Sequence, residues 1–339
     1  MNNKMQPLVT VLMPVYNCEK YVREAIESIL SQTYTNYIFL IINDGSIDNT
    51  ENIILSYTDQ RIQYERNEKN MGLIFSLNKG LALVKTKYIA RMDADDVSLP
   101  DRLQRQVDYM ELNSNIGVLG SWFQTFNEDK VGGISRYTER HQDIIFNHLY
   151  QQHICHPSCM IRFSVLEAES PWYDVKYVHA EDYDLFTRLS HKTVFANIPE
   201  VLLKIRKHKD EVSVIYEDIQ KKNSLKIKKR EFLTIGFESI SEKQIQNFEL
   251  LNYQNYNCIT ETPGTMKKFL ENMIMFNCKS KYFSENFLYE KLSTLWFNYC
   301  YELHLPIQIF KSSFLYNKDF LTVRRKFKWY INYVCSKCI

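Results

Sequence analysis

The residues with the clearest chemical potential lie together in Asp93-Ala94-Asp95-Asp96, directly after an apolar run at 87–92 that we expect to form a strand. Carboxylates this close together raise one another's pKa unless a cation offsets their charge. Mg²⁺ and Mn²⁺ prefer oxygen ligands and often join carboxylates to substrate phosphates. The spacing therefore indicates a metal–diphosphate site, although an acidic turn that caps a helix beginning near Pro100 would give the same pattern.

Two other expected strands end in polar residues. The run Leu8–Val15 leads into Tyr16 and Asn17, and the apolar run Tyr37–Ile42 leads into Asn43-Asp44-Gly45-Ser46. Ligands of open α/β sheets bind beyond the carboxyl ends of the strands, so we expect these groups to lie near the acidic segment. The chain has neither G-x-G-x-x-G after its first strand nor G-x-x-x-x-G-K-[ST], which argues against a dinucleotide enzyme and a P-loop enzyme.

The elements between these strands alternate in type. Apolar residues at helical spacing predict helices at Glu19–Gln32, with Asn17 as N-cap, at Asp48–Tyr57 and at Gly72–Val84, and a short strand is expected at Ile62–Glu65. This order predicts a mostly parallel, Rossmann-like sheet flanked by helices. Farther along, the sequence predicts a strand at 116–126, a helix at Glu181–Leu189 and strands at Val194–Ile198 and Val201–Arg206.

The character of the sequence changes beyond about residue 210, where strand signals become sparse. We therefore expect a catalytic domain over 1–214 and a mostly helical region over 215–339. Two stretches of the helical region, 221–230 and 324–330, are rich in basic residues. Such stretches bind the surface of anionic membranes, but a solvated helix face packed on the rest of the protein gives the same pattern equally well.

Composition narrows the class of protein. The net charge of the 339-residue chain is only +2, which with the lack of a nucleic-acid motif argues against a nucleic-acid partner. No secretory signal and no apolar run of membrane-spanning length are apparent, so we expect a cytoplasmic protein that contacts the inner face of the cytoplasmic membrane at most. The eight cysteines then favour buried or free thiols, and Cys335-x-x-Cys338 an incidental pair.

Seven ordered segments resemble the family 2 glycosyltransferases of the GT-A fold, over roughly residues 7–213. The segments are VTVLMPVYNCEKYVREAIESILSQTY, IINDGSIDNT, NMGLIFSLNKGL, YIARMDADDVSLPDRL, HPSCMIR, AEDYDLFTRL and PEVLLKIRKHKDEVS. The chain is most similar to bacterial enzymes that add single sugars to lipooligosaccharide or capsular polysaccharide. The resemblance implies an α/β GT-A fold, a nucleotide-sugar donor and a divalent metal, Mn²⁺ or Mg²⁺.

The resemblance also implies a donor site. Asp44 would accept a hydrogen bond from uracil, Asp93 would contact the ribose or diphosphate, and Asp95 would bind the metal with Asp96 as helper. Arg206 would neutralise phosphate and His208 would bind the metal or diphosphate, although Ile205 replaces the tyrosine that the family often has before this arginine. The residues implied to line the nucleoside pocket are Thr10, Pro14, Tyr16, Asn17, Asn70, Gly72 and Asn78.

The pair Glu181-Asp182 matches the family's Glu-Asp pair at a helix start. Transfer with inversion needs a carboxylate that takes the proton of the acceptor hydroxyl, a role the resemblance gives to Asp182, with Glu181 orienting the acceptor or its loop. A plain helix-capping pair is the alternative. His156 would border the sugar pocket, and Trp122 and Trp172 are candidate stacking groups that core packing explains equally well.

The sequence as a whole predicts an inverting transfer of a hexose or N-acetylhexosamine from a UDP-sugar to a glycan acceptor, which may be lipid-linked. The absence of a Gln-x-x-Arg-Trp motif and of membrane-spanning runs disfavours a processive synthase. A nucleotidylyltransferase would need a Gly-rich loop after the first strand, where Pro14-Val15-Tyr16-Asn17 stands instead. The remaining alternative is a non-catalytic nucleotide-sugar-binding or scaffold protein of the same fold.

Overall fold

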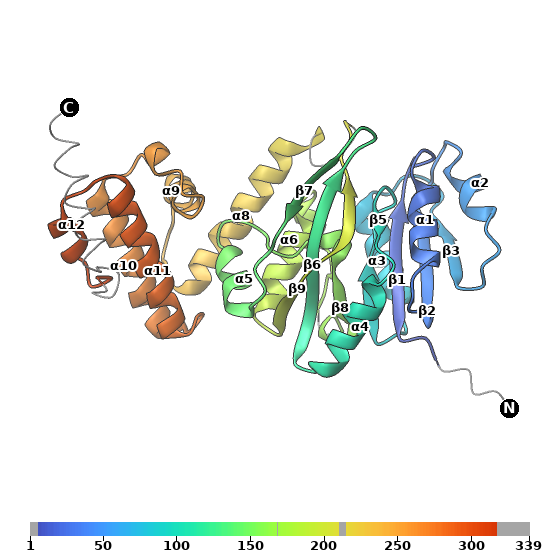
Figure 1. The fold of residues 1–339 in the computed structure, drawn as a ribbon, viewed down its shortest axis with the longest axis horizontal. Coiled ribbons are helices and arrows are strands. Elements are labelled where there is room, and N and C mark those ends of the chain that lie inside the picture. Colours follow the sequence, from blue (N-terminus) through green and yellow to red (C-terminus); the bar gives the residue numbers. More distant parts are fainter. Residues whose placement is uncertain (1–5, 168, 210–214, 317–339) are drawn as a thin grey trace. The chain divides into compact units, whose positions relative to one another are not determined.

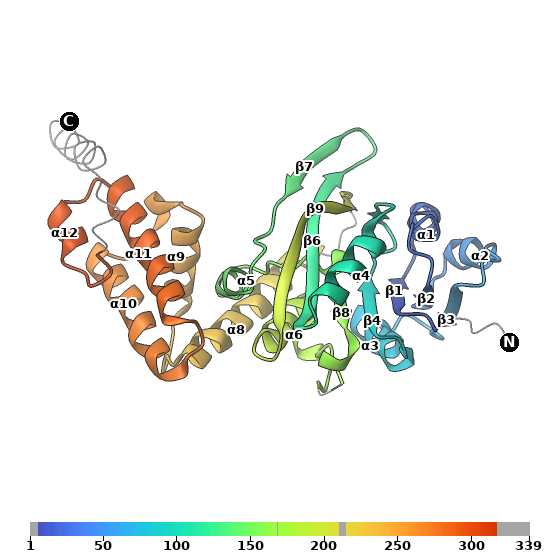
Figure 2. The same cartoon turned by 60° about the horizontal axis from the view of Figure 1, so that its bottom comes forward.

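The computed structural model describes residues 6–167, 169–209 and 215–316. The chain divides into two compact units, with the boundary between Ser224 and Leu225. Figures 1 and 2 show a sheet with helices on both sides in the first unit and a group of helices in the second. The order of the two units is the predicted one, an α/β part followed by a mostly helical part.

Strands β1 to β4 form the parallel half of the sheet. They are β1 Val9–Val15, β2 Tyr37–Asn43, β3 Ile62–Arg66 and β4 Tyr88–Arg91, in the spatial order β3-β2-β1-β4. All four coincide with predicted strands to within one or two residues. Because they are parallel, their carboxyl ends meet at one edge of the sheet.

The other half of the sheet is mixed. It contains β5 Val97–Ser98, β6 Ile116–Phe126, β7 Val131–Ser135, β8 Met160–Arg162 and β9 Val194–Arg206. Strand β8 joins the halves by pairing antiparallel with β4 and β6, and β9 runs parallel to β6. The two strands predicted at 194–198 and 201–206 are one strand, β9, because pairing with β6 continues past Pro199 with a shift of register. None of the predicted strands corresponds to β5, β7 or β8.

Helices cover both faces of the sheet and bury alternate residues of the strands. On one face, α1 Val22–Leu30, α2 Thr50–Leu55 and α4 Arg102–Leu112 pack on a core that includes Val11 and Met13 of β1. On the other, α3 Leu73–Leu83, α5 His141–Asn147 and α6 Glu181–Ser190 pack on a core that includes Leu12. Successive side chains of a strand point to opposite faces, which explains the division. The expected α/β fold is thereby confirmed.

Unit two consists of helices with an aromatic core. Helix α8, Glu217–Ile235, leads into it, and α9 Glu242–Asn252, α10 Pro263–Ser280, α11 Glu285–Glu302 and α12 Ile307–Lys311 follow. A capping box at Ser241 starts α9, and Thr262 caps α10. The rings of Phe232, Phe248 and Phe269 contact one another in its interior. Within the described residues, no helix has the length and apolar character to cross a bilayer.

The basic stretch 221–230 lies on α8, and four of its side chains have acidic partners. The pairs are Lys221–Glu217, Lys228–Glu249, Lys229–Glu242 and Arg230–Glu231, at 2.6, 2.7, 2.9 and 3.0 Å. Much of this positive charge is therefore neutralised within the protein, which favours the interpretation as a helix face over a membrane-binding stretch. The second basic stretch, 324–330, and the pair Cys335 and Cys338 lie outside the described residues.

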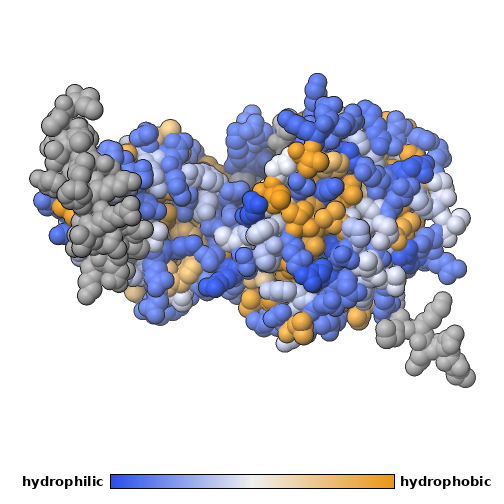
Figure 3. All heavy atoms as spheres, viewed as in Figure 1, coloured by the Kyte–Doolittle hydropathy of each residue, from blue (hydrophilic) through white to orange (hydrophobic). Residues whose placement is uncertain are grey.

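Figure 3 shows the surface of one face, on which hydrophobic residues gather over the region of β6 and β7. Val131 and Ile134 of β7 are among the exposed apolar residues, at 63% and 39%. Strand β7 pairs only with β6 among the described strands. These residues lie on a hairpin and not at the edge of the sheet where the predicted site residues gather.

Candidate active site

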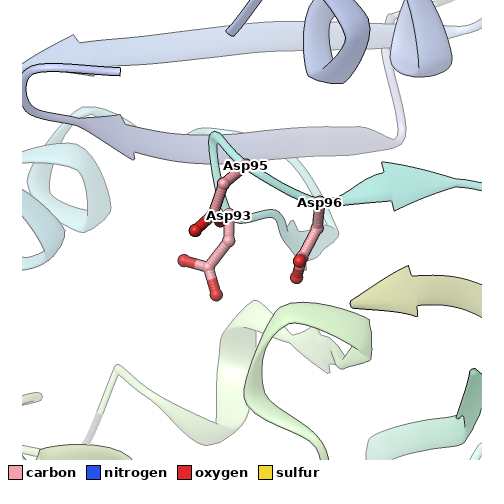
Figure 4. A group of neighbouring side chains, drawn as sticks. All are labelled: Asp93, Asp95 and Asp96. Atoms are coloured by element: carbon pink, nitrogen blue, oxygen red, sulfur yellow. The ribbon is translucent and has the colours of Figure 1, made fainter. Parts of the chain in front are cut away.

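The three carboxylates that follow β4 form a compact acidic loop. One oxygen from each of Asp93, Asp95 and Asp96 lies within 4.8 Å of the others. Figure 4 shows the three side chains pointing in the same general direction from the loop, with Asp96 beside the start of β5. Burial, together with the charges of Asp93 and Asp95, raises the pKa of Asp96 well above its usual value.

Each carboxylate of the acidic loop has a partner. Buried Arg91, the last residue of β4, forms an ion pair with Oδ1 of Asp93. Oδ2 of Asp95 lies 2.9 Å from Nε2 of His208, and Oδ1 of Asp96 accepts a hydrogen bond of 3.0 Å from the backbone N–H of Arg206. His208 was predicted to bind the metal or the diphosphate. In the structure its ring contacts Asp95, the predicted metal ligand.

Arg206 contacts the backbone of the acidic loop and not its carboxylates through its side chain. Its Nε donates to the backbone carbonyl of Asp95 at 2.9 Å, and its Nη2 forms an ion pair with Glu24. The guanidinium lies between the rings of Tyr21 and Phe126, 4.7 and 4.4 Å from their centroids, and the residue is 8% exposed. These contacts commit much of the side chain to the protein, and its role as a phosphate ligand stays a prediction.

Asp44 holds the segment that leads into α3. Its Oδ1 accepts hydrogen bonds from Asn67 Nδ2 at 2.7 Å and from the backbone of Met71 at 2.9 Å, and its Oδ2 accepts one from the backbone of Gly72 at 2.8 Å. The side chain of Asn70 also accepts from Gly72, at 3.0 Å. Residues 44 and 70–72, which the resemblance assigns to the nucleoside pocket, are thus adjacent in space.

Gly45 permits this close approach. Its φ is +72°, and a Cβ atom there would lie 2.4 Å from the backbone carbonyl carbon of Lys69. Any other residue at this position would be strained and would collide with the segment that carries Asn70. The turn after β2 therefore needs glycine for a steric reason.

Residues after β1 lie beside the turn after β2. The backbone N–H of Asn17 donates to Ser46 Oγ at 3.0 Å, and its side chain accepts from the backbone of Ile47 at 2.9 Å. Asn17 does not cap α1, which begins at Val22. Tyr16 is 42% exposed at this edge, whereas Pro14 is buried within β1.

Two predicted pocket residues lie elsewhere. Thr10 is the second residue of β1, buried, with its hydroxyl 2.8 Å from that of Thr86. At ~3.3 Å per residue it lies roughly 16 Å from the carboxyl end of its strand, too far to line the same pocket. Asn78 is bound to the backbone of Tyr173 through both atoms of its amide, at 2.9 and 3.0 Å. The structure therefore contradicts the assignment of Thr10 and gives Asn78 a scaffolding contact.

Asp182 is at the start of α6, and each of its oxygens has one neutral donor. Gln152 Nε2 donates to Oδ2 at 2.9 Å, and the backbone of Tyr183 donates to Oδ1 at 2.7 Å. Burial raises the pKa of Asp182, and burial together with the charge of Asp182 raises the pKa of Glu181 to about 7. Burial raises the pKa of Asp93, and the charges of Asp95 and, as a smaller contribution, of Asp182 raise it further, so the candidate base acts electrostatically on the acidic loop.

Sequence reasoning did not single out three groups that contact this site. Arg91 ends β4, Gln152 contacts Asp182, and the thiol of Cys18 donates to the carbonyl of Ala94 at 3.3 Å. Burial raises the pKa of the Cys18 thiol to about 12, with the acidic loop as a further cause, so it is a thiol and not a nucleophilic thiolate. An arginine in an otherwise apolar strand was the one signal that could have identified Arg91.

The acidic loop suits a divalent metal. Its donors are carboxylate oxygens, which Mg²⁺ and Mn²⁺ prefer, and the buried Asp96 carries a raised pKa that a cation would lower. Only Arg91, among the partners named above, supplies a full positive charge to these carboxylates directly, through Asp93. The residues present therefore fit a metal bound mainly by Asp95 and its neighbours.

Comparison with known proteins gives the family of the chain. The model of the family described as "Glycosyl transferase family 2" matches residues 10–169. An uncharacterized glycosyltransferase of Haemophilus influenzae is 34% identical over 282 residues, which are 79% of this chain and 86% of that protein. The Escherichia coli protein named UDP-Glc:alpha-D-GlcNAc-diphosphoundecaprenol beta-1,3-glucosyltransferase WfgD is 31% identical over 53% of this chain and 68% of its own length.

Solved structures share the fold. The crystal structure of Staphylococcus aureus TarS, residues 1–349, in complex with UDP-GlcNAc superposes with a TM-score of 0.58 at 16% identity, covering 85% of this chain and 83% of that one. At this identity the likeness concerns the fold alone. The matched family model and the 34% identity to the Haemophilus influenzae protein over most of both chains show the family. The chain belongs to glycosyltransferase family 2, and its fold and acidic loop agree with this.

Proposed function

We propose that the chain transfers a hexose or N-acetylhexosamine, with inversion, from a UDP-sugar to a hydroxyl group of a glycan in the synthesis of cell-surface polysaccharide or lipooligosaccharide. One observation carries the proposal: Asp93, Asp95 and Asp96 bring three carboxylate oxygens within 4.8 Å of one another just after β4, in a chain of glycosyltransferase family 2. A departing diphosphate needs a cation that stabilises its charge, and an attacking hydroxyl needs a base. In this proposal the acidic loop binds the cation and Asp182 acts as the base.

Each part of the site has a role in this proposal. Asp44, Tyr16 and Asn17 lie at the edge that would receive the nucleoside, next to the loop at 70–72. Asp93 and Asp95, with His208 in contact with Asp95 or as a further ligand, would hold the metal and the diphosphate. A bound divalent cation supplies positive charge that stabilises the departing diphosphate.

Asp182 would take the proton of the acceptor hydroxyl. Its donors, Gln152 and the backbone of Tyr183, fix both oxygens without adding a positive charge, and they lower its pKa less than burial raises it. Its raised pKa, from burial, makes it a stronger base than an exposed aspartate. Buried Glu181 beside it would orient the acceptor or its loop.

The names of two similar proteins support a UDP-linked donor and a lipid-linked acceptor. WfgD is named for UDP-Glc and a diphosphoundecaprenol acceptor, and the TarS structure holds UDP-GlcNAc. We extend both features to this chain as part of the proposal, with 1–214 as the catalytic part and 215–339 as a helical part. The paired charges of 221–230 argue against a contact with the inner face of the membrane through that stretch. Binding of the whole chain to anionic vesicles would test the last point.

The test is UDP release from a panel of UDP-sugars, with and without Mn²⁺, in the presence of a mixed glycan extract. We expect metal-dependent release from one donor, and a loss of at least about a hundredfold in Asp182→Asn and Asp95→Asn. Asp108→Asn makes the same change on an exposed face of α4 and should keep wild-type rates. UDP binding without turnover of any donor would favour the alternative of a non-catalytic nucleotide-sugar-binding protein.

A further inference from the structure

The side chains of Tyr173, His156 and Asp182, from three separate segments, lie in a row in that order. Nε2 of His156 lies 2.8 Å from the hydroxyl oxygen of Tyr173, and Nδ1 of the same ring lies 3.9 Å from Oδ2 of Asp182. His156 is 7% exposed and Tyr173 is 3% exposed, so protein and not water surrounds the ring. The two ring nitrogens thus face two different groups, and one of these is the proposed base.

Both members behind Asp182 are neutral. Burial, together with the positive charge of Arg91, lowers the pKa of His156 well below its usual value. Burial raises the pKa of Tyr173 well above its usual value. A neutral imidazole has one donor and one acceptor nitrogen. If the Tyr173 hydroxyl donates to Nε2, the proton of the ring is on Nδ1, the nitrogen that faces Asp182.

The position of Tyr173 is fixed from a helix on the same face of the sheet. Asn78 of α3 binds both the N–H and the C=O of Tyr173. The ring of Phe186 packs edge-on against His156, with centroids 5.9 Å apart. These contacts hold the imidazole between Tyr173 and Phe186, with Nδ1 on the side of the Asp182 carboxylate.

We propose that His156 is a positioning residue for Asp182, with its proton held on Nδ1 by Tyr173. This inference rests on the proposed role of Asp182 as base. At 3.9 Å the contact is longer than a hydrogen bond, and such contacts in substrate-free sites commonly shorten once substrate is bound. A neutral N–H orients the carboxylate toward the acceptor hydroxyl without lowering its basicity as a cation would.

Other charged and titratable groups also interact electrostatically with Asp182, but none of them takes the place of the His156 ring beside Oδ2. Arg91 of β4 favours the ionised carboxylate, whereas Glu181 of α6 and Asp93 of the acidic loop repel it. Cys159 and Tyr173 are protonated neighbours whose pKa values burial raises. The variants that test the inference therefore move the N–H donor at position 156 and leave the charge of the site unchanged.

The first experiment compares His156→Asn with His156→Gln. The amide nitrogen of asparagine reaches the position of Nδ1, whereas that of glutamine reaches the position of Nε2. We expect His156→Gln to lower kcat for UDP release about tenfold to a hundredfold with an unchanged donor KM, and His156→Asn to restore most of the rate. Tyr173→Phe should lower kcat in the same direction, and Tyr57→Phe, which removes a remote hydroxyl, should not.

The second experiment needs no substrate. The ¹⁵N shifts of the His156 ring in the whole protein report which nitrogen carries the proton. We expect a neutral ring protonated on Nδ1 at pH 7, and a loss of this tautomer's predominance in Tyr173→Phe. A ring protonated on Nε2 in the wild type would overturn the inference.

The outcomes separate the two proposals. Wild-type activity in Asp182→Asn would overturn the proposed base and this inference with it. Loss of activity in Asp182→Asn, with equal kcat in His156→Asn and His156→Gln, would retain the base and reject the positioning role. In the Asp182→Asn background, His156→Gln should have no further effect, because the two residues act through one step.

Discussion

The backbone N–H of Arg206 donates to Oδ1 of Asp96 across 3.0 Å, although 110 positions separate the two residues. This bond ties the last residue of β9 to the acidic loop after β4. The side chain of Arg206 adds a bond to the carbonyl of Asp95, so one residue holds both carboxylate-bearing positions. The shape of the acidic loop thus depends on a strand from the distant part of the domain.

Arg206→Ala should weaken metal binding and not nucleotide binding. Loss of the guanidinium frees the carbonyl of Asp95 and the carboxylate of Glu24, so the loop is less ordered. We expect the Mn²⁺ concentration for half-maximal activity to rise about tenfold, while the UDP-sugar KM at saturating Mn²⁺ changes little. A large increase in that KM would support the phosphate-binding role that the resemblance implied.

Thr10→Val should leave donor binding unchanged. The hydroxyl of Thr10 contacts that of Thr86 at the opposite end of β1 from the site, and Thr86 keeps a second bond to the carbonyl of Tyr88. The cost should be about 1 kcal/mol in the free energy of unfolding. Urea titration would measure this cost, and a changed donor KM would contradict the position of Thr10 in the sheet.

Glu181→Gln should stabilise the protein at alkaline pH. The pKa of Glu181 is raised from 4.5 to about 7, so between these values the folded chain binds more protons than the unfolded chain. Its contribution is therefore fully present below about pH 4.5 and is lost as the pH rises through about 7. We expect the variant to gain on the order of 1–3 kcal/mol over the wild type at pH 8. Melting temperatures of both proteins from pH 4.5 to 8 should diverge as the pH rises, and parallel curves would argue against a buried, protonated Glu181.

Asn78→Asp should destabilise the protein and lower kcat together. The new carboxylate still accepts from the N–H of Tyr173 but faces its carbonyl oxygen, where Asn78 now donates. An unsatisfied or repelled buried group costs about 1–3 kcal/mol. Asn52→Asp, a matched change on the exposed side of α2, should do neither. A raised donor KM with unchanged stability would instead support the place in the nucleoside pocket that the resemblance implies for Asn78.

The sequence was sufficient for the parallel half of the sheet and for the edge at which the site lies. Continuous apolar runs predicted β1, β2 and β4, and the polar residues that follow them, Asp44 and Asp93 among these, meet because parallel strands end together. The resemblance supplied the order of motifs but not the position of each residue along its strand. Counting residues along β1 would have excluded Thr10.

The contacts around Asp182 could not be predicted from the sequence, and the reason is physical. Gln152, His156 and Tyr173 come from irregular segments, whose side-chain directions follow no period. Short antiparallel strands such as β8, with three residues, carry too little pattern to be recognised. Which helix face meets which loop is decided by packing of the whole unit.

All three hydrogen bonds that Asp44 accepts come from the protein itself, from Asn67, Met71 and Gly72. Residues 71 and 72 are anchored by their own backbone N–H groups, and Gly45 lets the neighbouring segment close on them. An incoming nucleotide therefore meets a preorganised wall and spends none of its binding free energy on ordering it. Association at this edge should proceed at a rate limited by encounter and desolvation, with the differences among donors expressed in how fast they leave.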